Sequence, residues 1–446
     1  MDMISEEAMR DRAHLVRSNL PAKGLFAGLE WRISPEPFAL GAQTAKEIES
    51  LGRILFQFYR AANLLYRQSV AGKQPEWISR WLDLGKPAEL IEWQRSPAFK
   101  NDLPRVIRPD VLITDSGLRI TELDSVPGGI GLTAWLNRTY STKLSGGEQQ
   151  PELIGGAEGM TEGFRDIFGD AARVQIVISE ESATYRPEML WMARELGDRF
   201  HVRDGSYSEF APGDSVYRFF ELFDLSNVPS ARTLITMARE KQLRLTAPPK
   251  PVLEEKMLFA LLWNRHLRGF WRQELGEGFF ARLRDLVPYS WVVDPAPLPP
   301  HAVIPELGLT NWLELKALSQ KERDLILKVS GFSDQAWGSR GVHLGSDLPV
   351  ADWSAAVDRA LEGFHRSPYV LQKYYKPKIV PARWHDFGPD RTAAMEGRVR
   401  LCPYYFVIGE GDQARPRLGG ILATICPADK KIIHGMADAI LAPCSA

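Results

Sequence analysis

The stretch from 105 to 124 constrains the fold most, because it has the pattern of an antiparallel hairpin that ends in acidic side chains. Two runs rich in β-forming residues, 105–114 and 118–124, flank the turn sequence Asp115-Ser116-Gly117. A three-residue loop with glycine at positive φ is common in hairpins and would make Thr114 face Leu118. The sequence therefore predicts a β-hairpin here.

Acidic side chains meet across the open end of this hairpin. In the register set by a three-residue loop, Asp110 faces Glu122 and Arg108 faces Asp124. A two-residue loop would shift the register and put Asp110 and Glu122 on opposite faces. Opposed carboxylates repel unless a cation lies between them, and Mg²⁺ accepts a few carboxylates together with water and phosphate oxygens. The hairpin indicates a magnesium site, the alternative being a solvated polar face with a weak ion pair.

The glycine-rich segment 128–131 follows this hairpin directly. It matches neither the dinucleotide-binding fingerprint nor the P-loop, because no Lys-Ser/Thr pair follows. An ordinary turn and a close approach of a ligand to the backbone are both compatible with it.

The rest of the chain has the mixture of helical and β-strand patterns that is typical of an α/β (α+β) protein. Apolar residues recur at helical spacing over 44–70, and the proline-rich stretch 246–251 is the clearest break. We expect a mainly helical N-terminal region at 1–104, an α/β module with the acidic hairpin at 105–250, and a nucleotide-binding region at 251–446.

Further elements are expected within these regions. The run 173–179 predicts a buried strand, 186–197 the helix after it, and 214–225 another strand.

Composition excludes some classes of partner. The 55 basic and 56 acidic residues give a net charge of −1, so no overall field favours nucleic acid or an anionic membrane. Cys402, Cys426 and Cys444 lack the spacing of a zinc or redox pair. The N-terminus is too charged for a signal peptide and no apolar run could cross a bilayer, so we expect a cytoplasmic protein.

Two later strands carry groups suited to a nucleotide. Lys328 lies in a β-rich run before a glycine-containing loop, 331–341, that carries Arg340. A lysine on a rigid strand and an arginine on a flexible loop suit a polyphosphate. In the next strand, Gln372 and the backbone could read an adenine edge, with Tyr374 or Tyr375 against its face.

Taken in order, these segments resemble the synthetase domain of the glutathionylspermidine synthases, a circularly permuted branch of the ATP-grasp ligases. Arg108-Pro-Asp110 and Glu122-Leu-Asp124 match that family's Arg-x-Asp and Glu-x-Asn strands, with the same interval between acids. "SVYRFF" at 215–220 resembles a further family strand. The proline-rich segment and helix at 247–263 put Lys256 in the place of an ATP-contacting lysine.

The resemblance implies a circularly permuted ATP-grasp fold, with a helical N-terminal region and a small α/β module before the ATP-grasp region. It implies the cofactors ATP and Mg²⁺, with the metal acids preceding the lysines as the permutation requires. The implied residues are Asp110, Glu122 and Asp124 for the metal; Lys256, Lys328, Gln372, Lys373 and Tyr375 for ATP; and Arg340 and Arg108 for catalysis.

This sequence departs from the family pattern in three places. Asp124 replaces the family's asparagine, and no arginine follows Gly419-Gly420, so Arg400 or Lys430 must substitute or that contact is absent. We also expect the family's linked amidase half to be absent, because no cysteine precedes Cys402.

The activity that follows is ATP-dependent ligation of a small-molecule or peptide carboxylate to an amine through an acyl phosphate. No histidine or cysteine nucleophile is needed for it. Two alternatives stay open: a phosphotransferase on the same scaffold, and a non-catalytic nucleotide-binding interaction module.

Overall fold

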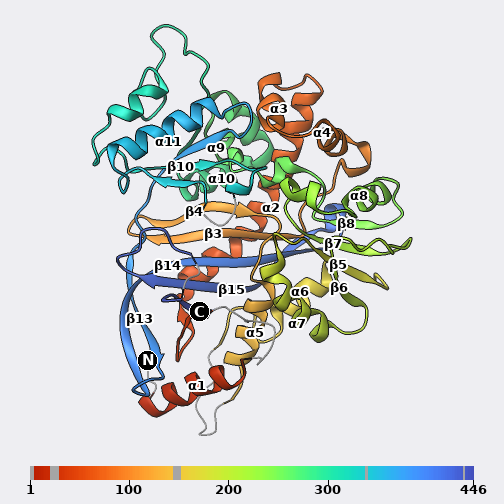
Figure 1. Ribbon diagram of the computed structural model, residues 1–446, viewed down its shortest axis with the longest axis vertical. Coiled ribbons are helices and arrows are strands. Elements are labelled where there is room, and N and C mark those ends of the chain that lie inside the picture. The colour runs from red at the N-terminus through yellow and green to blue at the C-terminus, as the bar shows by residue number, and fades with distance from the viewer. Residues whose placement is uncertain (1–4, 21–29, 144–151, 337–339, 435–436) are drawn as a thin grey trace.

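The computed structural model describes residues 5–20, 30–143, 152–336, 340–434 and 437–446. Within them the chain forms one large mixed sheet and two four-stranded sheets, with helices against each (Figure 1). The mixed helix and strand content that the sequence predicts is confirmed. None of the helices described there combines the length and the apolar character that a membrane crossing needs.

The eight-stranded sheet follows the order β1-β16-β15-β14-β3-β4, with β13 on β14 and β2 on β16. Its strands are β1 (Arg32–Ile33), β2 (Phe38–Ala39), β3 (Val106–Thr114), β4 (Gly117–Asp124), β13 (Ile379–Asp386), β14 (Arg391–Ile408), β15 (Arg415–Pro427) and β16 (Ile440–Ser445). Only β1 and β2 pair in parallel, both with β16. The sheet takes strands from all three regions expected from the sequence, and that division stays a prediction.

Helices cover both faces of this sheet because its central strands alternate apolar side chains between two cores. Along β14, Leu401 and Val407 join one core, whereas Cys402 and Phe406 join the other. The first core holds α2 (Ala42–Val70), α9 (Met257–Trp263) and α10 (Arg268–Leu286). The second holds α1 (Glu6–Ser18), α5 (Ile130–Tyr140), α6 (Gly159–Asp166) and α7 (Arg186–Leu196).

The long helix α2 confirms the periodicity seen at 44–70. Leu51, Leu55, Phe58 and Leu65 are buried along one stripe of it. Two shorter helices, α3 (Glu76–Asp83) and α4 (Ala88–Arg95), follow it. The described residues of the N-terminal part are therefore mainly helical, with β1 and β2 as the only strands among them.

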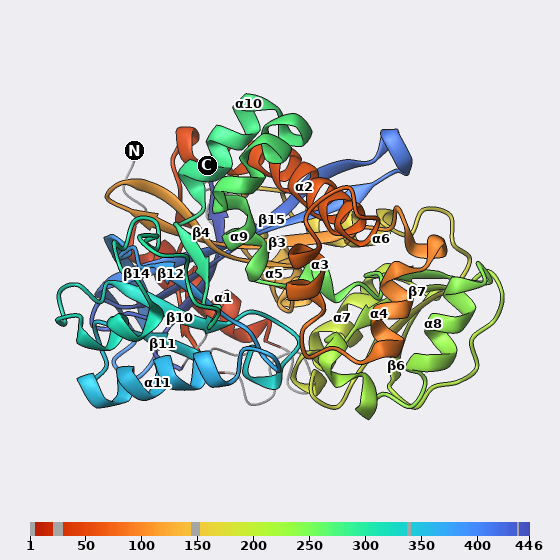
Figure 2. The ribbon, with the colours of Figure 1, turned by 90° about the horizontal axis from the view of Figure 1, so that it is seen from above.

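The two smaller sheets lie on opposite sides of Figure 2. The antiparallel one follows β11-β10-β12-β9, formed by β9 (Ser290–Val292), β10 (Leu325–Val329), β11 (Val342–Leu344) and β12 (Tyr369–Lys373), and packs on α11 (Val350–Glu362). The parallel one follows β6-β5-β7-β8, formed by β5 (Val174–Ile178), β6 (Phe200–Asp204), β7 (Ser215–Phe219) and β8 (Arg244–Thr246), with α8 (Ala231–Arg239). The strand predicted at 214–225 is shorter than expected, because a 3₁₀ helix begins at Leu222.

The acidic hairpin forms, but its turn differs from the prediction. Thr114 faces Gly117 across a two-residue turn instead of facing Leu118. A β-bulge then inserts Thr121 opposite no partner, so that Asp110 faces Glu122 after all. The predicted pairing at the open end is confirmed, and the three-residue loop was wrong.

Candidate functional site

A pocket of about 550 Å³ opens beside the open end of the β3–β4 hairpin. Its walls come from the hairpin, the start of α5, α7, the segment after β7, the segment before α9, and strands β14 and β15. The charged residues that line it are Arg108, Asp110, Glu122, Asp124, Glu188, Glu221, Glu254, Lys256 and Arg400.

Asp110 lies between two arginines at the base of this pocket. Its carboxylate accepts a hydrogen bond from Arg400 at 3.0 Å, and Arg108 Nη2 lies 3.3 Å from its other oxygen. Burial alone would raise the pKa of Asp110, but Arg400 and Arg108 outweigh it and hold that pKa below its ordinary value. Asp110 is therefore a buried carboxylate that stays charged.

Arg400 reaches the site because β14 lies between β15 and β3, where Arg400 pairs with Leu112. Lys430, the other substitute named from the sequence, lies 3.9 Å from Asp438 and does not line the pocket. Arg400, not Lys430, thus supplies a cation to the site. The Nε atoms of Arg400 and Arg108 are buried without a hydrogen-bond partner among the described residues. Two unpaired guanidinium donors suit an anionic ligand.

The other two predicted metal acids, Glu122 and Asp124, lie on β4 next to Asp110 of β3. Asp124 Oδ2 is 3.2 Å from Arg108, and Glu122 Oε1 is 2.9 Å from Lys256. Burial raises the pKa of Asp124 despite Arg108, and the charges of Glu122 and Asp110 raise it further. A divalent cation would relieve the repulsion that Glu122 and Asp110 exert on Asp124, so the donor set fits Mg²⁺.

Lys256 and Lys328, the two lysines predicted to bind phosphate, both contact the β3–β4 hairpin. Lys256 Nζ also donates to the carbonyl of Ala336 at 3.1 Å. Lys328 on β10 donates to the carbonyl of Thr121 and to Gln372 Oε1, each at 3.1 Å. Burial lowers the pKa of Lys328 to about 8. The bulge residue Thr121 therefore links the metal acids to the second sheet.

Lys328 and the remaining predicted residues lie outside the pocket lining. Arg340 forms an ion pair with Glu181 at 2.9 Å near the surface, and residues 337–339 of its loop lie outside the described residues. Gln372 is buried on β12 and donates to Ser290, whereas Lys373 ends that strand exposed. Tyr375 lies against the guanidinium of Arg119 at 4.7 Å.

The glycine-rich segment begins a helix next to the pocket. Gly129 has φ +86°, and a Cβ on Gly131 would meet the carbonyl oxygen of Glu188 at 2.4 Å. The Glu188 carboxylate accepts the backbone N–H groups of Gly129 and Leu132, at 2.8 and 2.9 Å, at the N-terminus of α5. Burial raises the pKa of Glu188 to about 7, against these hydrogen bonds.

Glu188 is one of three acids that the sequence analysis missed. Glu254 pairs with the fully buried Arg218 of β7. Burial, together with the nearby Glu254, raises the pKa of Glu221 well above its ordinary value. These acids form an acidic wall, defined here as Glu188, Glu221 and Glu254. No local pattern marks them, because only the packing of α7, the segment after β7 and the segment before α9 brings them to the pocket.

The whole chain shares its fold with a solved glutathione synthetase-like effector from Globodera pallida in its apo form. The two match with a TM-score of 0.55 at 10% identity, over 99% of this chain and 98% of that chain. A proposed gamma-glutamylcysteine synthetase from Methylobacillus flagellatus matches at 10% identity over 92% of this chain and 89% of its own. Its TM-score of 0.40 is too low to define the fold. No family model and no curated protein matches the sequence.

Proposed function

We propose that this protein is an ATP-dependent carboxylate–amine ligase of the ATP-grasp type, similar to the glutathionylspermidine synthases. One observation carries the proposal: Asp110, Glu122 and Asp124 converge with Lys256 at one end of a pocket. Lys328 approaches the same hairpin from the second sheet. The fold shared with a glutathione synthetase-like protein supports ligase chemistry. The predicted metal acids precede the lysines along the chain, and this order supports a circularly permuted ATP-grasp fold.

The predicted acids would hold the metal ion, and the predicted lysines would contact the phosphates. Mg²⁺, when bound, would neutralise the phosphates and align the transferred phosphoryl group. Asp110, Glu122 and Asp124 would hold it, with Glu122 exchanging Lys256 for the metal. Lys256 and Lys328 would then be free to contact phosphate oxygens, and burial strengthens these contacts.

The nucleotide base would lie along β12. Gln372, Lys373 and Tyr375 come from that strand and its continuation, and Tyr375 offers an aromatic face that Arg119 now occupies. Arg340 would exchange Glu181 for the γ-phosphate of a bound nucleotide. Transition-state charge is where an arginine contributes most.

The two substrates would meet between two arginines and the acidic wall. Arg108 and Arg400, each with an unpaired Nε, suit the substrate carboxylate and its phosphorylated form. The acidic wall suits a protonated amine, and Glu188 can take a proton near neutral pH as the amine attacks. The attack forms the amide bond, breaks the acyl–phosphate bond and releases inorganic phosphate.

One observation favours a non-catalytic nucleotide-binding module instead. Arg108 and Arg400 already pair with both oxygens of Asp110, so Asp110 would have to give up one arginine to bind a metal.

An assay of nucleotide products decides between these functions. Purified protein is given Mg-ATP with pools of acids, with and without pools of amines. A ligase releases ADP and phosphate only when both pools are present. ADP with an acceptor hydroxyl compound alone would indicate a phosphotransferase, and tight ATP binding without turnover a binding module. AMP as the main product would exclude the acyl-phosphate route.

A further inference from the structure

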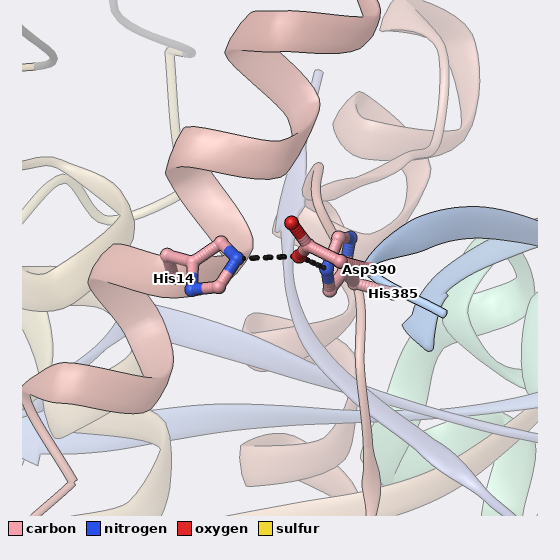
Figure 3. A group of neighbouring side chains, drawn as sticks. All are labelled: His14, His385 and Asp390. Carbon is pink, nitrogen blue, oxygen red and sulfur yellow. Dashed lines mark hydrogen bonds and ion pairs between the residues drawn. The ribbon is translucent and has the colours of Figure 1, made fainter. Parts of the chain in front are cut away.

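A second cluster of metal-binding side chains lies where helix α1 packs against the β13–β14 hairpin. His14 comes from α1, His385 from the end of β13, and Asp390 from the turn before β14. Both imidazoles point their Nε2 atoms at one carboxylate oxygen of Asp390, at 2.7 and 2.9 Å (Figure 3). All three ligand atoms lie within 4.8 Å of one another.

The surroundings hold these side chains in place. The His385 ring is buried and lies edge-on to Phe387 at 4.6 Å, and His14 lies edge-on to the same ring at 5.4 Å. Arg17 covers Phe387 at 4.2 Å. Asp390 adopts φ +52°, a left-handed conformation that aspartate tolerates better than most residues and that turns its carboxylate toward the two histidines.

One side of the cluster is enclosed by protein and the other is open to water. The Nδ1 atom of His385 is buried and has no hydrogen-bond partner among the described residues, while its Nε2 faces the cluster. His14 and Asp390 are each half exposed. The cluster therefore has a fixed, buried side and a side open to water.

We propose that His14, His385 and Asp390 bind one Zn²⁺ or a similar borderline divalent ion, with water as the fourth ligand. Two imidazoles and one carboxylate suit such ions and disfavour Mg²⁺. Bonds of about 2.0–2.2 Å need only small movements of the Asp390 oxygen and the exposed His14 ring. The bound ion would replace the imidazole–carboxylate hydrogen bonds.

The site would fasten α1 to the β13–β14 hairpin. His14 and Asp390 are 376 positions apart in the chain, so one ion would join two distant segments. None of the three residues lines the pocket beside the β3–β4 hairpin. The proposal is therefore independent of the ligase chemistry.

The test uses the full chain without an affinity tag, stripped of metal by chelator and titrated with Zn²⁺ by calorimetry. We expect one Zn²⁺ to bind per chain. His14→Gln and Asp390→Asn should weaken it by more than the roughly 10- to 100-fold that loss of an outer-shell partner costs. His266→Gln removes an exposed histidine elsewhere and is the matched control, which should bind Zn²⁺ as the unaltered protein does.

Hydrogen exchange gives a second readout. Zn²⁺ should slow exchange in 6–18 and 379–391 in the unaltered chain and in His266→Gln, but not in His14→Gln. Both exposed ligands can be changed without opening the core, so folding is not at stake. The proposal is overturned if the unaltered chain binds no Zn²⁺. It is also overturned if His14→Gln binds as tightly as the control.

Discussion

Arg400 Nη1 lies 3.0 Å from Asp110 Oδ2 although 290 positions separate the two residues. Arg108 pairs with the same carboxylate, so the first predicted metal acid is also the centre of a buried ionic network. The simple repulsion between Asp110 and Glu122 that the sequence indicated is therefore not what these two residues experience.

Asp110→Asn and Glu122→Gln should affect stability differently, although both should abolish Mg²⁺-dependent turnover. The first removes the carboxylate charge that Arg400 and Arg108 share, at side chains only 22% and 16% exposed, and should cost about 3–5 kcal/mol of unfolding free energy. The second removes a partly exposed partner of Lys256 and should cost at most about 1 kcal/mol. Urea denaturation measures both, with Asp115→Asn in the exposed turn as control. Equal losses of unfolding free energy in the two variants would contradict the ionic network around Asp110.

The contribution of Asp110 should depend on pH in a defined direction. Its folded-state pKa lies below the ordinary value of 3.8, so its stabilisation is complete above that value and is lost as pH falls below it. The gap in unfolding free energy between the unaltered protein and Asp110→Asn should narrow below about pH 4. A gap that stays constant to lower pH would show that charge does not cause it.

Glu188 should show the opposite dependence. Its folded-state pKa of about 7 exceeds the ordinary 4.5, so the fold favours its protonated form. Relative to Glu188→Gln, the unaltered protein should lose up to about 3 kcal/mol as pH rises from 4.5 to 7. Denaturation at several pH values measures this difference. Glu195→Gln, on the same helix, is the control variant.

Nucleotide binding should take up a proton near pH 8 through Lys328. The lysine is partly neutral there because burial lowers its pKa to about 8, and an approaching phosphate would raise it again. Calorimetry in buffers of different ionisation enthalpy should report uptake on the order of half a proton. Lys328→Gln should abolish it and Lys316→Gln should not. Uptake that survives in Lys328→Gln would assign the proton elsewhere.

Arg340→Ala should lower turnover by about 10²- to 10³-fold with little change in nucleotide affinity. The matched variant Glu181→Gln breaks the same ion pair but keeps the arginine, so it should leave turnover near that of the unaltered protein. Steady-state kinetics and equilibrium binding of ATP separate the two effects. Loss of affinity alone in Arg340→Ala would favour the binding module.

The sequence was most informative where a pattern is local. Helical periodicity over 44–70 predicted α2, and residue spacing predicted that Asp110 faces Glu122. The bulge at Thr121 was missed, because nothing in the sequences of β3 and β4 shows that one residue of β4 will lack a partner on β3. Two compensating differences, a shorter turn and one extra residue, produced the expected pairing.

Long-range pairing could not be predicted in this way. Arg400 was named only as one of two substitutes, since the sequence does not show that β14 pairs with β3. The histidines likewise formed no recognisable pattern. His14 and His385 meet only because the packing of α1 against the hairpin brings them together. Sequence spacing carries no information about contacts of that kind.

The place of β14 in the large sheet has a consequence for synthesis of the protein. On the ribosome, β3 and β4 emerge long before the strand that will lie beside them, and β1 and β2 must wait for β16. During that interval the hairpin presents an unpaired edge, which invites wrong partners. The acidic pocket acquires its second arginine only when β14 leaves the exit tunnel. A nascent chain can thus complete the pocket beside the β3–β4 hairpin only late in translation, after most of its described helices have already been made.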